Sequence, residues 1–409
     1  MMTRDQHPFI KLIKHLFRNL HYQLTRFYFF IVPRFMPRLT NENFGINFIG
    51  YAHGELGLGQ AMRSLVLCAH VASIPFMVRK FKVNIPSRQS NDELSSYFSE
   101  HCQHPINIIC VNPDKLHLLP NWINYGEWAK TYNIGYWFWE LENFPKKWQY
   151  ATHIVDEIWV ATEYIANAMR KSGKKVVKIP FPLEFDAPIA SINKDYFGID
   201  RNKFTFLFSY DFLSSLNRKN PQGVINAFMK AFPGGNDSVR LVIKTMNAAT
   251  HPAELKKLLI LINSDPRIVV RDSYLSQAEM RGLIRSSDCY ISLHRAEGLG
   301  LGLAEAMYMG IPTIATAYSG NLEFMNSSNS LLVPYHLVPI AQGEYPNGDG
   351  ELWAEPNIDE AASAMRKIVD DLDFRQNLGI KASTHMQLHH SYARAASVIK
   401  AELERLRYK

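Results

Sequence analysis

The chain has 409 residues, too many for one compact core and enough for two domains. Its composition, 47% hydrophobic and 20% charged without a low-complexity tract, is that of a folded globular protein and excludes a disordered class. Four cysteines, Cys68, Cys102, Cys110 and Cys289, form neither a CxxC pair nor a disulfide framework. This usage indicates a reducing compartment, so we expect a cytoplasmic protein.

The formal net charge of +7 is concentrated at the N-terminus. Seven Lys and Arg residues but a single acidic residue, Asp5, lie in the first forty positions, so the rest of the chain is nearly neutral. A nucleic-acid-binding protein of this size is expected to carry a basic stripe across its fold. We therefore expect no nucleic-acid partner.

The basic segment, residues 1–44, is predicted to form an amphipathic arm. Between Pro8 and Pro33, apolar residues recur at helical spacing with basic residues on the other side. The longest apolar run, 27–32, is far too short to span a bilayer, and no signal peptide is recognisable. A basic amphipathic helix suits an anionic leaflet, so residues 8–33 are predicted to contact the inner face of the membrane peripherally. Packing of this helix on the protein's own domain is the alternative.

Beyond the arm, short apolar runs alternate with helical patterns. Continuous apolar strands joined by helices are typical of parallel sheets covered on both faces. A polar stretch at 182–203 predicts a hinge between two doubly wound, Rossmann-like domains, with a ligand in the cleft where they face each other. The predicted boundaries are 45–185 and 186–385 for the two domains and 386–409 for a C-terminal helix.

A glycine-rich loop between two glutamates marks the predicted ligand site. Residues 291–316 read ISLHRAEGLGLGLAEAMYMGIPTIAT, which predicts a strand, a loop and a helix. Glycines let backbone N–H groups approach an anion, and a helix start adds its positive end, so we expect a pyrophosphate there. Glu305, one turn into the helix, is placed to bind a ribose diol, and Glu297 to reach hydroxyls beyond the phosphate. This pattern indicates a sugar nucleotide; an early glutamate that only complements the helix dipole is the alternative.

These residues resemble the family 4 retaining glycosyltransferases. Glu297 and Glu305, with GLGLGLA between them, match the family's E-x7-E signature, and AMYMGIPTIATAYSGNLEFM and NSLLVPY resemble the segments that follow it. The resemblance covers about residues 45–400 and implies the GT-B fold, a nucleotide-sugar donor, and a reaction without metal or cofactor. It assigns the ribose to Glu305 and the donor sugar to Glu297. Further donor-binding positions that it implies are Gly298, Leu299, Gly300, Leu301, Gly320 and Asn321.

A second segment, SYDFLSSLNRKNPQGVINAFMKAF at 209–232, resembles the part of the family that clamps the pyrophosphate with an arginine and a lysine. Lys219 matches the lysine. The arginine at the strand end is missing, because Tyr210 and Asp211 stand there, and Arg218 is the expected substitute. Adjacent cations at a helix start offset the charge on a departing nucleoside diphosphate. A solvated charged pair is the alternative.

Two segments of the first domain complete the predicted site. NFIGYAHGELGLGQAMRSL at 47–65 reads as strand, glycine loop and helix, and the resemblance places Gly57 and Gly59 beside the donor phosphates.

The second segment, NIGYWFWELENFPKKW at 133–148, holds three tryptophans. Aromatic rings stack on sugars, so Trp137, Trp139 and Glu140 form a possible acceptor platform, with core packing as the alternative. Glu140 is the preferred catalytic group because a carboxylate between tryptophans is costly to bury unused. The family's catalytic-site histidine has no counterpart between His117 and His153, so the group that replaces it stays open.

Together these features predict a metal-independent glycosyltransferase that moves a sugar with retention to a glycan or lipid-linked acceptor. Cell-surface polysaccharide biosynthesis, lipopolysaccharide included, is the expected context. The alternatives are a GT-B nucleotide-sugar epimerase and a non-catalytic sugar-nucleotide-binding module; the intact glutamate pair argues against the module. The predicted catalytic residues are Glu297, Lys219, Arg218 and Glu140.

Overall fold

The computed structural model describes residues 16, 17, 19, 20, 23, 24, 44–81, 87–234 and 237–407. The predicted basic helix at 8–33 therefore lies outside the described residues except for six positions, of which the four apolar ones are exposed. In the part of the chain that is described, no helix is long and apolar enough to cross a membrane.

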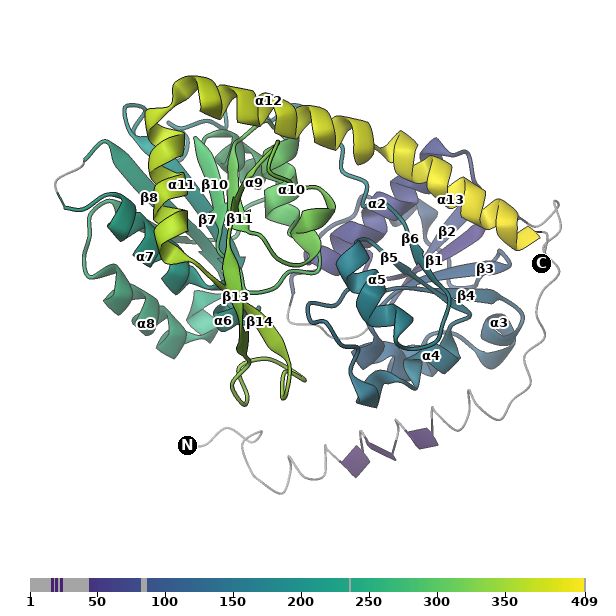
Figure 1. The fold of residues 1–409 in the computed structure, drawn as a ribbon. Coiled ribbons are helices and arrows are strands. Elements are labelled where there is room, and N and C mark those ends of the chain that lie inside the picture. The colour runs from purple at the N-terminus through teal and green to yellow at the C-terminus, as the bar shows by residue number, and fades with distance from the viewer. Residues whose placement is uncertain are drawn as a thin grey trace.

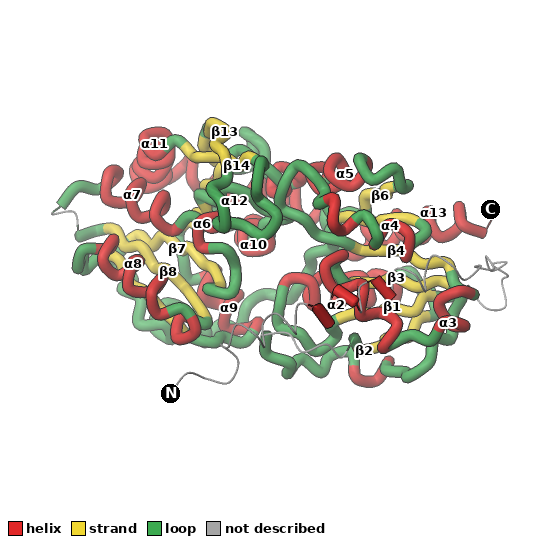
Figure 2. The backbone as a smooth tube through the Cα atoms, turned by 90° about the horizontal axis from the view of Figure 1, so that it is seen from below, coloured by secondary structure: helices red, strands yellow, loops and turns green. Residues whose placement is uncertain are grey.

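Two six-stranded sheets form the centres of two layered domains (Figure 1). Every strand pairing in both sheets is parallel, so the predicted pair of doubly wound sheets is confirmed. Figure 2 shows the strands of the two sheets as separate groups, each flanked by helices. The first sheet has the order β2-β1-β3-β4-β5-β6, with β1 (Ile46–Gly50), β2 (Phe76–Lys80), β3 (Ile106–Cys110), β4 (Tyr132–Tyr136), β5 (Glu157–Val160) and β6 (Val176–Lys178). The second has the order β12-β11-β10-β7-β8-β9, with β7 (Phe204–Asp211), β8 (Val239–Met246), β9 (Ile268–Asp272), β10 (Cys289–Ser292), β11 (Thr313–Thr316) and β12 (Leu331–Val333).

The strands are apolar because helices cover both faces of each sheet. All residues of β1, β3, β4 and β5 are buried, as continuous apolar runs require. The helices of the first domain are α2 (Gly57–Val71), α3 (Tyr125–Ala129), α4 (Ala151–Ile154) and α5 (Glu163–Arg170). The second domain has α6 (Leu216–Lys219), α7 (Pro221–Ala231), α8 (Pro252–Ile262), α9 (Gln277–Arg285), α10 (Leu301–Tyr308) and α11 (Ile358–Asp370), and an antiparallel hairpin of β13 (Tyr335–Pro339) and β14 (Leu352–Pro356).

The chain crosses between the domains twice, and the two crossings touch. Helix α12 (Leu372–His389) runs along the second domain, and α13 (Tyr392–Arg407) returns to the first, where it packs against α2 (Figure 1). The predicted C-terminal helix is thus present. At the break between α12 and α13, the carbonyl of His390 accepts a hydrogen bond from the Leu183 N–H at 2.7 Å. The His390 ring lies with Nδ1 3.2 Å from the carbonyl of Phe181, so the two crossings are in direct contact.

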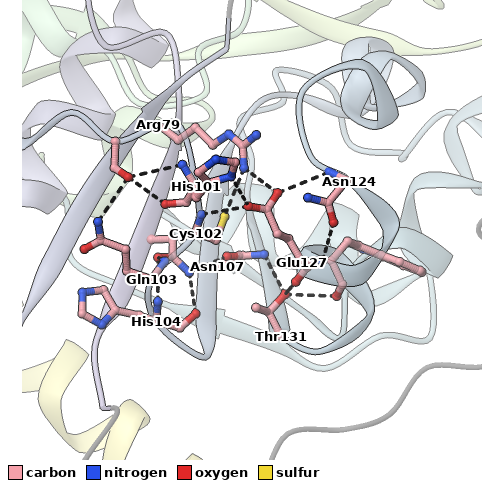
Figure 3. A network of polar contacts seen from close by, with 12 residues as sticks. Arg79, His101, Cys102, Gln103, His104, Asn107, Asn124, Glu127 and Thr131 are labelled. Atoms are coloured by element: carbon pink, nitrogen blue, oxygen red, sulfur yellow. Dashed lines mark hydrogen bonds and ion pairs between the residues drawn. The ribbon is translucent and has the colours of Figure 1, made fainter.

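Three asparagines at equivalent positions of neighbouring strands cross the first sheet. Asn47, Asn107 and Asn133 are in register on β1, β3 and β4. The side-chain amide of Asn47 donates to Asn107 Oδ1, and that of Asn107 donates to Asn133 Oδ1, both at 2.8 Å. Asn47 Oδ1 accepts from the backbone N–H groups of Gln103 and His104. Figure 3 shows Asn107 within this polar network. Because a one-residue slip would bury these amides without partners, the ladder fixes the strand register.

Replacing the central asparagine should destabilise the first domain. Asn107→Ala leaves the Asn47 amide and the Asn133 oxygen each short of a buried partner, so we expect a loss of about 2 kcal/mol or more in the free energy of unfolding. Urea unfolding followed by circular dichroism measures the loss. The exposed Asn202→Ala is the control, expected within about 0.5 kcal/mol of wild type. Equal effects of the two substitutions would show that the ladder does not stabilise the sheet.

Candidate functional site

A cleft of about 900 Å³ opens between the domains at the carboxyl ends of both sheets. The first domain lines it with residues that follow β1, β2, β3, β4 and β6, and the second with residues at the ends of β7, β8 and β10 or after β7, β8, β9 and β10. Strands β7 and β10 are neighbours at the point where the strand order of the second sheet reverses. Ligands of doubly wound sheets bind at such a switch point.

A buried cluster of one carboxylate and two cations lies on the second-domain side of this cleft. One carboxylate oxygen of Glu297 forms an ion pair with Lys219 Nζ. The other oxygen lies 3.1 Å from Arg218 Nη1. Glu297 is 8% exposed, and Arg218 also donates to the carbonyl of Ala296 at 2.8 Å. The structure thus brings together three predicted catalytic residues, two from α6 after β7 and one from the loop after β10. Glu297 and Lys219 line the cleft, whereas Arg218 lies behind them.

Charge compensation decides the ionisation of Glu297 and Arg218, whereas at Lys219 burial outweighs the charge of Glu297 and lowers the pKa. Burial alone would raise the pKa of Glu297, but the positive charges of Lys219 and Arg218 outweigh it and hold the pKa at about 2. Burial opposes the charge of Arg218 as well, yet Glu297 raises the pKa of this guanidinium overall. Glu297 is therefore ionised at neutral pH and pairs with both Lys219 and Arg218.

The glycine loop is shaped for close approach. Gly300 has a φ of +87°, in the left-handed region that favours glycine, and it caps the N-terminus of α10. The loop also meets the first domain, since Thr162 Oγ1 donates to the carbonyl of Gly298 at 3.0 Å. Of the predicted donor-binding residues, those that line the cleft are Gly57, Gly298, Leu299, Gly300, Leu301 and Glu305.

The other predicted donor-binding residues lie behind the cleft. A Cβ on Gly320 would stand 2.0 Å from the carbonyl oxygen of Gly298, and the Gly320 N–H donates to the carbonyl of Glu297 at 2.8 Å. Asn321 lies with Oδ1 3.1 Å from Nε2 of the buried His294. Gly59 lets α2 pass against the preceding turn, where a Cβ would lie 2.2 Å from a backbone oxygen. These residues hold the shape of the loops rather than line the cavity.

Glu305 is the unpaired carboxyl of the cleft. Its side chain is 9% exposed and faces the cavity, and among the described residues it has no hydrogen-bond partner. Burial raises its pKa to about 7, with Arg281 opposing in part. A buried acceptor of this kind suits a ligand that brings its own hydroxyl donors.

The tryptophans of 133–148 do not form an open platform. Trp137 and Trp139 are 0% and 4% exposed, because Trp137 stacks on Phe144 and Trp139 packs edge-on against Trp148. The structure therefore decides for the core-packing alternative. Glu140 follows them and does line the cleft.

Lys244 is a cleft residue that the sequence analysis missed. It lies at the carboxyl end of β8, in register with Ser209 of β7, and is only 5% exposed. Its ammonium donates to the carbonyl of Thr245 at 2.9 Å, and among the described residues no carboxylate pairs with it. Burial lowers its pKa, against the opposing charge of Asp272. The one available signal was a lysine ending an apolar strand, in RLVIKT.

No group of three or more His, Cys, Asp or Glu side chains in the described ranges is arranged to hold a metal ion.

Comparisons with known proteins agree with the fold. Residues 205–371, less than half of the chain, match the sequence model of the family described as Glycosyl transferases group 1. No curated protein matches the chain. HepE from Anabaena, solved with UDP and glucose, superimposes with a TM-score of 0.64 at 13% identity over 88% of this chain and 100% of HepE.

Two further solved structures have the same architecture. Sucrose-phosphate synthase from Thermosynechococcus elongatus gives a TM-score of 0.65 at 13% identity, covering 88% of this chain and 99% of its own. A glycosyltransferase from Rickettsia africae gives 0.63 at 12% identity, covering 89% and 99%. At such identities the likeness shows the fold alone. The fold is GT-B, as predicted, and the second domain carries the sequence features of a group 1 glycosyltransferase.

The raised pKa of Glu305 has a consequence for stability. A carboxyl whose folded pKa lies near 7 stabilises the fold fully below its ordinary pKa of 4.5, and this stabilisation is lost as the pH rises through 7. Glu305→Gln removes the group, so between pH 5 and pH 8 the ligand-free variant should gain up to about 3 kcal/mol relative to wild type. Urea unfolding at both pH values measures this difference, with the exposed Glu404→Gln as control. Parallel pH dependences of Glu305→Gln and wild type would contradict the assignment.

Proposed function

We propose that the chain is a metal-independent glycosyltransferase that moves a sugar, with retention, from a nucleotide-sugar donor to a hydroxyl of a glycan or lipid-linked acceptor. The observation that carries the proposal is the placement of Glu305, Lys219 and the Glu297 loop around one interdomain cleft. The match of residues 205–371 to group 1 glycosyltransferases supports it independently.

In the proposed complex, the nucleotide of the donor lies near Glu305 and its sugar near Glu297 and Glu140. The ribose diol donates to Glu305, the diphosphate meets the N-terminus of α10 and the ammonium of Lys219, and the sugar extends toward Glu297 and Glu140. Lys244 adds a buried cation to the nucleotide end of the cleft. Structures of the same fold that were solved with UDP and with UDP-glucose make UDP-sugars the first donors to test.

In the reaction, the bond between the anomeric carbon and the diphosphate oxygen breaks while the acceptor oxygen attacks the same face of the sugar. The acceptor's proton passes to the departing phosphate oxygen. Lys219 and the backbone amides of the loop stabilise the negative charge that develops on the leaving group. Arg218 acts through Glu297, which it holds in place from behind. Because these fixed cations supply the positive charge, the proposed mechanism uses no metal ion.

We propose that the enzyme works in the cytoplasm, where it assembles a polysaccharide destined for the cell surface. The basic N-terminal arm would then hold the enzyme at the membrane, close to a lipid-linked acceptor.

Thermal stabilisation tests donor binding and identifies the base. Wild type and Glu305→Ala are melted with UDP, GDP, ADP and their glucose conjugates. A ligand at 100 times its dissociation constant adds about 2.7 kcal/mol to the free energy of unfolding, and this shift should appear in wild type only. If no nucleotide stabilises wild type, the proposed function fails. Product analysis with the donor that binds then separates transfer from epimerisation and from binding alone.

Removing the leaving-group cation should slow turnover far more than it weakens binding. For Lys219→Ala we expect kcat to fall roughly 100-fold or more, as for the loss of one donor that stabilises a developing anion. Glu297 keeps Arg218 as a partner, so the variant should fold. Release of the nucleoside diphosphate measures turnover, and Lys230→Ala, which removes an exposed lysine paired with Asp359, is the matched control. Equal rates for both variants would remove Lys219 from the mechanism.

A further inference from the structure

The β13–β14 hairpin belongs to neither parallel sheet. It follows β12 in the second domain and lies at the boundary between the two domains (Figure 1). Its side chains Ile340 and Trp353 are buried in the same apolar cluster as Trp137 and Trp139 of the first domain. The hairpin is therefore attached to the second domain by its backbone and to the first by its packing.

Two adjacent residues at the tip of this hairpin bind opposite walls of the cleft. Glu344 holds α6 of the second domain, since Asn217 Nδ2 donates to its carboxylate at 2.9 Å and Ser215 Oγ donates to its backbone carbonyl at 3.1 Å. Tyr345 holds the first domain, because its hydroxyl donates to Glu140 Oε2 at 2.8 Å. The tip thus fixes the cation-bearing helix and the Glu140 carboxylate relative to each other.

The ring of Tyr345 completes the link to the charged cluster. The guanidinium carbon of Arg218 lies 5.9 Å from the ring centre, and the ring of Trp139 packs at 6.1 Å on another side. Burial and the neighbouring Glu140 raise the pKa of the Tyr345 hydroxyl, which therefore keeps its proton and donates. Glu140, Tyr345, Arg218 and Glu297 form one chain of contacts from wall to wall.

We propose that Tyr345 is a positioning residue for glycosyl transfer, which aims the Glu140 carboxylate at the sugar held between the two walls. The hydroxyl of Tyr345 is the hydrogen-bond donor to the Glu140 carboxylate among the described residues. Without it, the carboxylate can turn away while the packing of Ile340 and Trp353 keeps the hairpin in place. This role rests on the proposed function, since it concerns the transferred sugar.

Tyr345→Phe removes the hydroxyl and keeps the ring. Its control is Tyr335→Phe on the same hairpin, whose ring packs on Tyr318 and whose hydroxyl has no hydrogen bond among the described residues. The donor is UDP-glucose or whichever glucose conjugate stabilises wild type. We expect Tyr345→Phe to lower kcat roughly tenfold or more, as for the loss of a hydrogen bond to a charged group. Affinity for the free nucleotide should stay within about twofold, while the added affinity due to the glucose moiety, measured by calorimetry, should fall.

A double-mutant cycle separates positioning from a general structural effect. Glu140→Gln lowers both kcat and the glucose-dependent affinity, and adding Tyr345→Phe to it should change neither further. Additive losses, or equal behaviour of Tyr345→Phe and Tyr335→Phe, would overturn the positioning role while donor binding still supports the proposed function. If no nucleotide sugar binds wild type, the proposed function itself falls and the positioning role with it.

Discussion

The structure of the cleft depends on the burial of the Glu297 carboxylate. An isolated carboxylate at that depth would be expensive, so it must have cations within contact distance. Lys219 and Arg218 supply them from α6, which follows β7, while Glu297 lies on the loop after β10. This one requirement joins two segments whose paired residues are 78 positions apart in the chain, at the switch point of the second sheet.

The residues around the cations repeat the same connection. Asn220, which has a left-handed φ of 54°, caps α7 with its side-chain oxygen and donates its amide to the carbonyl of Leu293. The backbone of Arg295 donates to the carbonyl of Arg218 at 2.8 Å. Each side chain of the short motif Arg218-Lys219-Asn220 therefore contacts the loop between β10 and α10. Its charge, backbone conformation and position at a helix start serve one geometry.

The fold could be predicted from the alternation of apolar strands and helices, because burial on both faces leaves a continuous run of apolar residues in each strand. The sequence also predicts Glu297 and Glu305, whose spacing around one loop is local, and Lys219, which lies in a separate short motif at a helix start. Whether Trp139 is exposed could not be read in the same way, because beside the local Trp148 it also packs against Tyr345 of a hairpin about 200 residues later. The same holds for Gly320 and Asn321, whose positions behind the loop follow from packing between separate segments. Lys244 was missed because its neighbours on the sheet come from other strands.

Eight positions separate the two glutamates, yet their surroundings give them opposite chemistry. Both are almost fully buried, and burial disfavours the charged form of each. Two cations in contact reverse this effect for Glu297, whereas Glu305 has only the distant Arg281 and so titrates near neutrality. The ionised Glu297 is suited to pair with cations and to accept hydrogen bonds from sugar hydroxyls. Glu305 is suited to accept hydrogen bonds from the donors of a ligand. The spacing places both groups on one cleft. The cations of α6 decide that Glu297 is the glutamate in the ion-pair cluster and that Glu305 stays free to bind a ligand.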